Sequence, residues 1–149
     1  MKKSIKTSSI FHSRGITMIE VLVALVILSI GLLGLASLQA NALKYNQSAY
    51  MRTQATQYAY DIADRMRANR DVALAGGYDI ALADAAPTST TVVDQDLAAW
   101  LGDVATLPNG DGSIVRNNQQ FTITVQWEDD RTEATQANRV QNFVFVTEL

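Results

Sequence analysis

The chain has 149 residues, of which 48% are hydrophobic and 18% charged, with 12 basic and 15 acidic side chains. It contains no cysteine, and its one histidine is His12. Thiol chemistry is therefore excluded, and imidazole chemistry could come from His12 alone. We expect a protein that is not an enzyme, with no catalytic residue, no metal site and no cofactor, and with one modest domain besides any membrane segment.

The first 15 residues form a basic leader that ends at Gly15. Its basic residues are Lys2, Lys3, Lys6 and Arg14. An excess of Lys and Arg beside an apolar segment keeps that side in the cytoplasm. Without the leader, 8 basic residues remain against 15 acidic ones, a net charge of −7. This balance disfavours direct binding to a nucleic acid, which needs clustered Lys and Arg.

An uncharged, mostly apolar run follows, from Val21 to Leu43. About 20 such residues in a helix cross a hydrocarbon core of roughly 30 Å. We predict a transmembrane helix over residues 16–43, with everything after about Lys44 on the far side. Gly31 and Gly34 interrupt this helix. They serve either close helix packing or a local loosening of the helix.

A single carboxylate, Glu20, stands at the start of the apolar run. A charge there is costly in lipid and is expected to pair with a cation or to face a protein interior. Thr17–Glu20 also matches the S/T-x-x-E capping box, in which Glu20 would reach back to the backbone of Thr17. Both interpretations stay open, but capping alone does not account for Gly15 and the basic leader.

The order of basic leader, Gly15, Ile-Thr-Met-Ile-Glu over residues 16–20 and apolar helix resembles the class III signal of type IV prepilins and pseudopilins. The resemblance implies that a prepilin peptidase cuts after Gly15 and methylates Ile16, where Phe or Met is more usual. It implies that Glu20 pairs with the N-terminal amine of a neighbouring subunit during filament assembly. It also implies that Gly31 and Gly34 let the helix loosen as the subunit leaves the bilayer.

Helical spacing continues beyond the membrane segment, over residues 44–70. No proline occurs before Pro87, which allows one helix from about Thr17 to about Arg70. The apolar positions, interrupted by Arg52, are Leu38, Ala42, Tyr45, Ala49, Ala55, Ala59, Ile62 and Met66. Near the end, Asp61 and Arg65 are spaced for an i,i+4 ion pair, and Arg65, Arg67 and Arg70 suit the negative end of the helix dipole.

The string Asp-Arg-Met-Arg-Ala-Asn-Arg over residues 64–70, with residues 21–25 and 29–35, resembles the minor pilins of type IV pili. The resemblance implies a prepilin with a cytoplasmic N-terminus and a periplasmic C-terminal domain, which primes pilus assembly and enters the surface pilus. The implied partners are prepilin peptidase, the major pilin, other minor pilins, the inner-membrane assembly platform and membrane lipid. A minor pseudopilin of type II secretion and a membrane-anchored adhesive module remain alternatives.

Residues 71–149 are expected to form the periplasmic globular region. Residues 76–91 are predicted to be a loop or a poorly ordered connection, because Ala, Asp, Ser and Thr dominate there. Asp94 is predicted to cap a short helix that runs to about Val104. The buried side of this helix would consist of Leu97, Trp100, Leu101 and Val104.

A change to period two follows the turn cluster Pro108–Gly112. Phe121, Ile123, Val125 and Trp127 alternate with polar residues, which predicts a strand with one buried face. Residues 113–116 are expected to pair with it across Asn117-Asn118, and residues 139–147 to form a third strand. The predicted fold is α+β, with a small antiparallel sheet packed on the outer half of the long helix.

Residues 109–113, Asn-Gly-Asp-Gly-Ser, also faintly resemble a calcium-binding loop. The distal glutamate of the twelve-residue pattern is missing, so we expect a plain turn and no metal.

Overall fold

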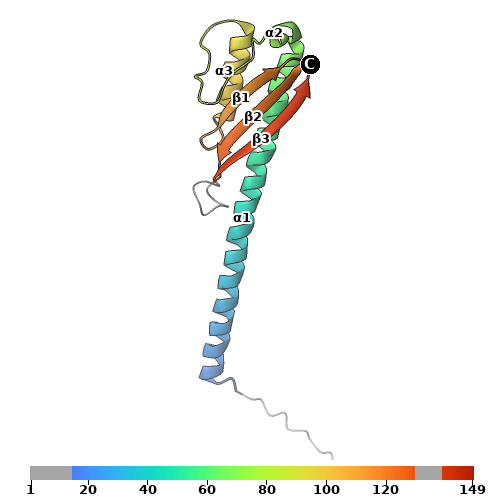
Figure 1. Cartoon of the computed structure of the whole chain (residues 1–149). Helices are drawn as coiled ribbons and strands as arrows, with labels where there is room; N and C mark the ends of the chain where they lie inside the picture. Colours follow the sequence, from blue (N-terminus) through green and yellow to red (C-terminus); the bar gives the residue numbers. More distant parts are fainter. Residues whose placement is uncertain (1–14, 130–138) are drawn as a thin grey trace, which may run out of the picture. The chain divides into compact units, whose positions relative to one another are not determined.

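The computed structural model describes residues 15–129 and 139–149 (Figure 1). The predicted leader therefore lies outside the described residues, except for Gly15. The chain divides into two compact units, Met1–Ala40 and Asn41–Leu149, and each is considered by itself. The elements are α1 (Met18–Ala68), α2 (Arg70–Leu74), α3 (Val92–Val104), β1 (Asp111–Asn117), β2 (Gln120–Glu128) and β3 (Val140–Glu148). A long apolar helix followed by a three-stranded antiparallel sheet confirms the predicted α+β class.

The described part of the first unit is the N-terminal half of α1. Its large apolar side chains are all exposed, from 47% at Val21 to 86% at Met18. Among the described residues, α1 is the one helix long and apolar enough to cross a membrane. Its most apolar 18-residue window has a mean hydropathy of 2.7 and no buried residue. By length and composition, this half of α1 is suited to a lipid environment.

The sheet belongs to the second unit and has the order β1-β2-β3, antiparallel throughout. Asn117 pairs with Gln120 at the end of the β1–β2 hairpin. The two turn residues are therefore Asn118 and Gln119, one position later than predicted. Asn118 has a φ of 59°, in the left-handed region that asparagine tolerates better than most residues.

The core of the second unit lies between one face of the sheet and the helices. The alternation predicted for β2 is confirmed, because Phe121, Ile123, Val125 and Trp127 are all buried. Fully burying an aliphatic or aromatic side chain of this kind is worth about 1.5–3 kcal/mol. The residues that α1 and α3 contribute to the same core are Met51, Ala55, Ala59, Ile62, Ala63, Met66, Leu97, Trp100 and Val104.

The buried face of α1 differs in part from the predicted apolar positions. Four of them are buried as expected: Ala55, Ala59, Ile62 and Met66. Tyr45 and Ala49 are exposed, whereas Met51 and Ala63 join the core. The physical reason is that burial on α1 begins at Met51. The apolar side chains of this unit that precede Met51 have no other element packed against them.

The long helix ends at Ala68, close to the predicted end at about Arg70. Asn69 has φ −121° and ψ 46°, outside the helical region, and the short helix α2 then begins at Arg70. The backbone amide of Asn69 still bonds to the carbonyls of Arg65 and Met66. A change of direction therefore replaces the simple helix end that the three arginines suggested.

The predicted capping role of Asp94 is wrong, because α3 starts earlier. Thr91 is the N-cap, with extended φ −68° and ψ 154°, and its hydroxyl accepts a hydrogen bond from the Asp94 amide at 3.2 Å. The Asp94 carboxylate accepts from the hydroxyls of Ser89 and Thr91. Leu97, Trp100 and Val104 are buried as predicted, while Leu101 is only partly buried.

Part of the connection between α2 and α3 is well fixed, although the sequence suggested a loop or a poorly ordered stretch. Tyr78 and Ile80 are buried in the core. Ile80 exchanges two backbone hydrogen bonds with Ile114 of β1, at 3.0 and 2.9 Å. This segment therefore lies along the edge of β1 that faces away from β2.

Candidate functional site

The Gly15–Ile16 peptide bond lies in an uncovered stretch just before α1. Residues 15–17 are not helical, and a Cβ placed on Gly15 would meet nothing within 4 Å. The side chain of Ile16 is 77% exposed. A protease that binds its substrate as an extended chain can therefore reach this bond without unwinding the helix.

The Thr17 side chain caps the start of α1, and the Glu20 side chain takes no part in this cap. The Glu20 amide donates to the Thr17 hydroxyl at 3.4 Å and to the Thr17 carbonyl at 3.1 Å. The return half of a capping box, from the Glu20 carboxylate to the Thr17 amide, is not formed. Within the described residues the Glu20 carboxylate has no hydrogen bond and no ion pair, so it is free to accept a cation.

A shallow apolar groove runs along α1 beside this carboxylate. Its lining residues are Ile16, Glu20, Val21, Ala24, Leu25 and Leu28. Spacings of three and four residues place them on one side of the helix. An ammonium group held here would pair with a carboxylate in low-dielectric surroundings, where a charge-assisted hydrogen bond is stronger than in water.

Gly31 and Gly34 lie within α1, and a Cβ at either position would meet nothing within 4 Å. Nearby, the Ser29 hydroxyl donates to the Leu25 carbonyl at 2.7 Å, which satisfies this polar group inside the helix. Both glycines therefore lie on open helix surface. Their two predicted roles, close packing and local loosening, both remain predictions.

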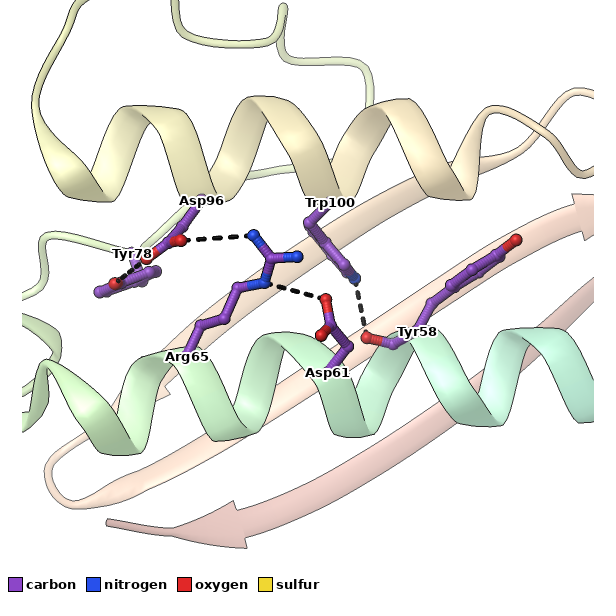
Figure 2. A network of polar contacts seen from close by, with 6 residues as sticks. All are labelled: Tyr58, Asp61, Arg65, Tyr78, Asp96 and Trp100. Carbon is purple, nitrogen blue, oxygen red and sulfur yellow. Dashed lines mark hydrogen bonds and ion pairs between the residues drawn. The ribbon is translucent and has the colours of Figure 1, made fainter.

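A polar cluster joins α1 to α3 at the other end of the long helix (Figure 2). Arg65 donates to Asp61 at 2.9 Å, the i,i+4 pair that the spacing predicted, and also to Asp96 of α3 at 3.3 Å. The other Asp96 oxygen accepts the Tyr78 hydroxyl at 2.8 Å. Arg65 thus links two helices, and its partner Asp96 lies 31 positions away in the sequence.

Titration shifts in this cluster follow its geometry. Burial raises the pKa of the Tyr78 phenol above its usual 10.0, and the hydrogen bond to the Asp96 carboxylate raises it further. For Arg65, burial lowers the pKa, but Asp61 and Asp96 outweigh burial and the net shift is upward. The guanidinium is therefore a permanent cation, and the phenol stays neutral and able to donate.

Three further hydrogen bonds attach α3 and the C-terminal end of the chain to α1 and α2. The Trp100 indole donates to the Tyr58 carbonyl at 3.0 Å (Figure 2). Arg67 donates to the Thr147 hydroxyl at 2.9 Å, and Arg70 donates to the Leu149 carbonyl at 2.8 Å. Arg67 and Arg70 therefore link the helix end to the C-terminal end of the chain, a contact that sequence spacing alone did not reveal.

The turn considered as a calcium loop uses its oxygen atoms within the protein. The two Asp111 oxygens accept the backbone amides of Ala83 and Gly112, each at 2.7 Å. The Asn109 amide group donates to Glu128 at 2.9 Å. Within residues 15–129 and 139–149, no group of three or more His, Cys, Asp or Glu side chains is arranged to hold a metal ion.

Comparison with known proteins identifies one feature of the chain. Residues 10–36 match the family model described as the prokaryotic N-terminal methylation motif. No curated protein and no solved structure matches the chain. The matched segment contains Gly15, Ile16 and Glu20, and it indicates a type IV pilin-like protein with a class III signal. The apolar half of α1 is compatible with a membrane-anchored pilin.

Proposed function

We propose that this protein is a minor pilin that primes the assembly of type IV pili and is incorporated into them. Among minor pilins, the string over residues 64–70 and the segments 21–25 and 29–35 most resemble PilV, the type IV pilus modification protein. In this proposal it is an inner-membrane prepilin with a cytoplasmic N-terminus. It supports twitching motility, adhesion or DNA uptake through the pilus, and it is not an enzyme.

The observation that carries the proposal is the combination at the start of α1. An uncovered Gly15–Ile16 bond and a free Glu20 carboxylate lie within the matched methylation motif. Cleavage would create a free N-terminal amine at Ile16 of this chain, as the same cleavage would at the start of each neighbouring pilin. The Glu20 carboxylate could then accept the N-terminal amine of the neighbouring subunit. Prepilin peptidase, the major pilin, other minor pilins, the assembly platform and lipid would be the partners.

The physical reason for a priming subunit is nucleation. The first subunits of a filament must leave the bilayer together. As each one leaves, its apolar helix loses its lipid surroundings, and the carboxylate at the start of that helix needs a partner. A preformed group of helices pairs these charges and covers these apolar surfaces beforehand, which lowers the barrier. Loss of the subunit should then reduce filament number while the major pilin remains in the membrane.

The decisive experiment is deletion of the gene, with surface pili and secreted enzymes measured in parallel. A priming minor pilin predicts few pili and little twitching or DNA uptake, with partial recovery of filaments when pilus retraction is blocked. Abundant, functional pili with failed enzyme export would assign the protein to type II secretion as a minor pseudopilin. Normal pili and export, with ligand binding by the protein, would indicate an adhesive module instead.

A pair of variants separates the two interpretations of Glu20. Glu20→Gln removes the charge and leaves the Thr17 cap in place, whereas Thr17→Ala removes the cap and leaves the charge. We expect Glu20→Gln to insert and be cleaved but to be recruited poorly into pili, because a neighbour's amine then lacks its anion. Thr17→Ala should be recruited nearly normally. The reverse order would favour the capping role.

Processing has a direct test in the intact mass of the membrane-extracted protein. We expect a mature chain that begins at Ile16, with a methyl group on its amine. A chain that still begins at Met1, or one cut after Ala36 or Ala40, would overturn the proposal.

A further inference from the structure

The two outer edges of the sheet are protected to very different degrees. Along β1, Ile80 exchanges two backbone hydrogen bonds with Ile114 in an isolated bridge on this edge. On the other side, β3 is the last strand of the sheet, with no further strand beside it among the described residues (Figure 1). The β1 edge is therefore occupied at its centre, while the β3 edge is open as far as residues 15–129 and 139–149 show.

The register shows which backbone groups of β3 face the open side. Leu149 donates to Gln119 and Asp129 donates to Arg139, so odd-numbered residues of β3 exchange hydrogen bonds with β2. Even-numbered residues point their amide and carbonyl groups away from β2. Between the two end residues of β3 these are Asn142, Val144 and Val146, and among the described residues their outward backbone groups have no backbone partner.

β3 also lacks the features that usually protect an edge strand. It has nine residues, no proline and no lysine, and its one charge is Glu148 at its end. Val144 and Val146 are 55% and 50% exposed on the face away from the core. Soluble proteins usually block such an edge with charge, proline, a bulge or a covering segment, because it is a template for another strand.

We propose that the open edge of β3 pairs with an extended strand of a second, different pilin-like chain anchored in the same membrane. The proposal rests on the proposed function and names one kind of partner for it. The partner strand that fits beside Asn142–Val146 is uncharged and rich in β-branched residues. The reason is that the side chains of β3 in this range are neutral on both faces of the sheet.

A second copy of this chain does not fit the same edge. Antiparallel pairing of β3 with its own copy has a two-fold axis perpendicular to the sheet. Because α1 packs flat against the sheet, that axis would reverse one α1 relative to the other. Head-to-tail pairing with β1 of a copy is blocked by Ile80. The sheet of this chain can therefore accept one foreign strand, but it cannot propagate through identical subunits.

Hydrogen exchange resolved to single amides tests the proposal on the full chain. The protein would be compared in its own membranes, with its partners present, and as a purified monomer in detergent. We expect the amides of Val144 and Val146 to exchange at least about tenfold more slowly in the membrane sample, while those of Phe143 and Phe145 are already slow in both. Protection in this alternating pattern is specific to strand addition.

Two blocking variants and one control test the same edge by mutation. Val144→Pro removes an outward amide and leaves the ladder with β2 intact, whereas Val144→Thr retains the amide and the β-branched shape. Val144→Lys adds a charge to the edge and is a second blocking variant if proline disturbs the fold, which tryptophan fluorescence would reveal. We expect Val144→Pro and Val144→Lys to lose the alternating protection and Val144→Thr to retain it.

Three results would overturn the inference. Equal exchange at Val144 and Val146 in both samples would show that the edge stays open. Uniform slowing of both even and odd residues would indicate a helix or lipid covering the sheet face. Protection that appears in the purified chain as its concentration rises would indicate self-pairing. Failure of the proposed function is distinguishable, because it would appear as normal pili after deletion, whatever the exchange pattern at β3.

Discussion

The two halves of α1 are both rich in apolar residues, but these residues are exposed in the first half and buried on one side of the second. Between Val21 and Leu38 the leucines, isoleucines and valines are about half exposed or more. From Met51 to Met66 the apolar residues on one side of the helix are buried under a sheet and α3. Helical spacing alone therefore does not tell where an apolar side chain will be buried. The surrounding solvent, lipid or protein decides this, and matched substitutions in the two halves measure the difference.

The largest expected contrast comes from one isoleucine in each half. Ile62 is fully buried, so Ile62→Ala should lower the free energy of unfolding of the second unit by about 2–5 kcal/mol. Ile30→Ala should leave it unchanged, because Ile30 is 66% exposed. Urea titration in detergent measures this through tryptophan fluorescence, since both tryptophans, Trp100 and Trp127, report the core. Equal destabilisation by both variants would contradict the comparison.

Glycine substitutions give the next contrast. A Cβ on Gly112 would overlap the Trp100 ring, so Gly112→Ala should destabilise the second unit by about 1–3 kcal/mol through overpacking. Gly31→Ala and Gly34→Ala meet no neighbour and should leave the same unfolding curve unchanged. We expect the double alanine variant to insert normally but to change recovery in sheared pili, because alanine stiffens the helix. Equal recovery would exclude a role for local loosening.

A smaller effect is expected from pH, and only in the second unit. The raised pKa of Tyr78 means that the folded state holds its proton more tightly than the unfolded state does. This stabilisation is complete below pH 10, the unfolded pKa, and is lost as the pH rises through the folded value. Tyr78→Phe should abolish this loss, whereas Tyr45→Phe, at an exposed position, should retain it. Thermal unfolding between pH 8 and pH 11 decides, with both variants measured against the parent chain.

The smallest effect is expected at Asp61. Its side chain is 47% exposed, and Arg65 keeps its second partner, Asp96, when Asp61 is changed. Asp61→Asn should therefore cost only a few tenths of a kcal/mol, as for other exposed i,i+4 pairs. Asp96→Asn should cost more, since Asp96 serves both Arg65 and Tyr78. Equal losses would mean that the contact between α1 and α3 contributes nothing beyond the pair within α1.

Local patterns predicted the local structure well. Period two located β2 and its buried residues, because alternation along one strand needs no knowledge of the partner. The position of the hairpin turn was wrong by one residue, since Asn117 and Asn118 are equally good turn residues. The start of α3 was missed because Thr91 lies in a run of Ser and Thr in which several side chains could cap a helix.

Contacts between distant residues could not be predicted in the same way. Nothing near Arg65 in the sequence points to Asp96, and nothing near Ile80 points to Ile114. The candidate site at the start of α1 was recognisable because its residues are consecutive, from Gly15 to Glu20. The sequence left open whether Glu20 closes a capping box, because both interpretations share one motif. The structure was needed to show that the Glu20 amide bonds to the Thr17 hydroxyl, whereas the Thr17 amide does not bond to the Glu20 carboxylate.

The bonds from Arg67 to Thr147 and from Arg70 to Leu149 span 80 and 79 positions of the chain. Contacts that close such long loops form late in folding, because their entropy cost precedes their gain. The chain is synthesised from its N-terminus, so α1 is made well before β3. During this interval the apolar side of α1 between Met51 and Met66 lacks its sheet. A holding factor at the membrane surface would matter most in that interval, and slowing translation between residues 70 and 140 should increase degradation of the nascent domain.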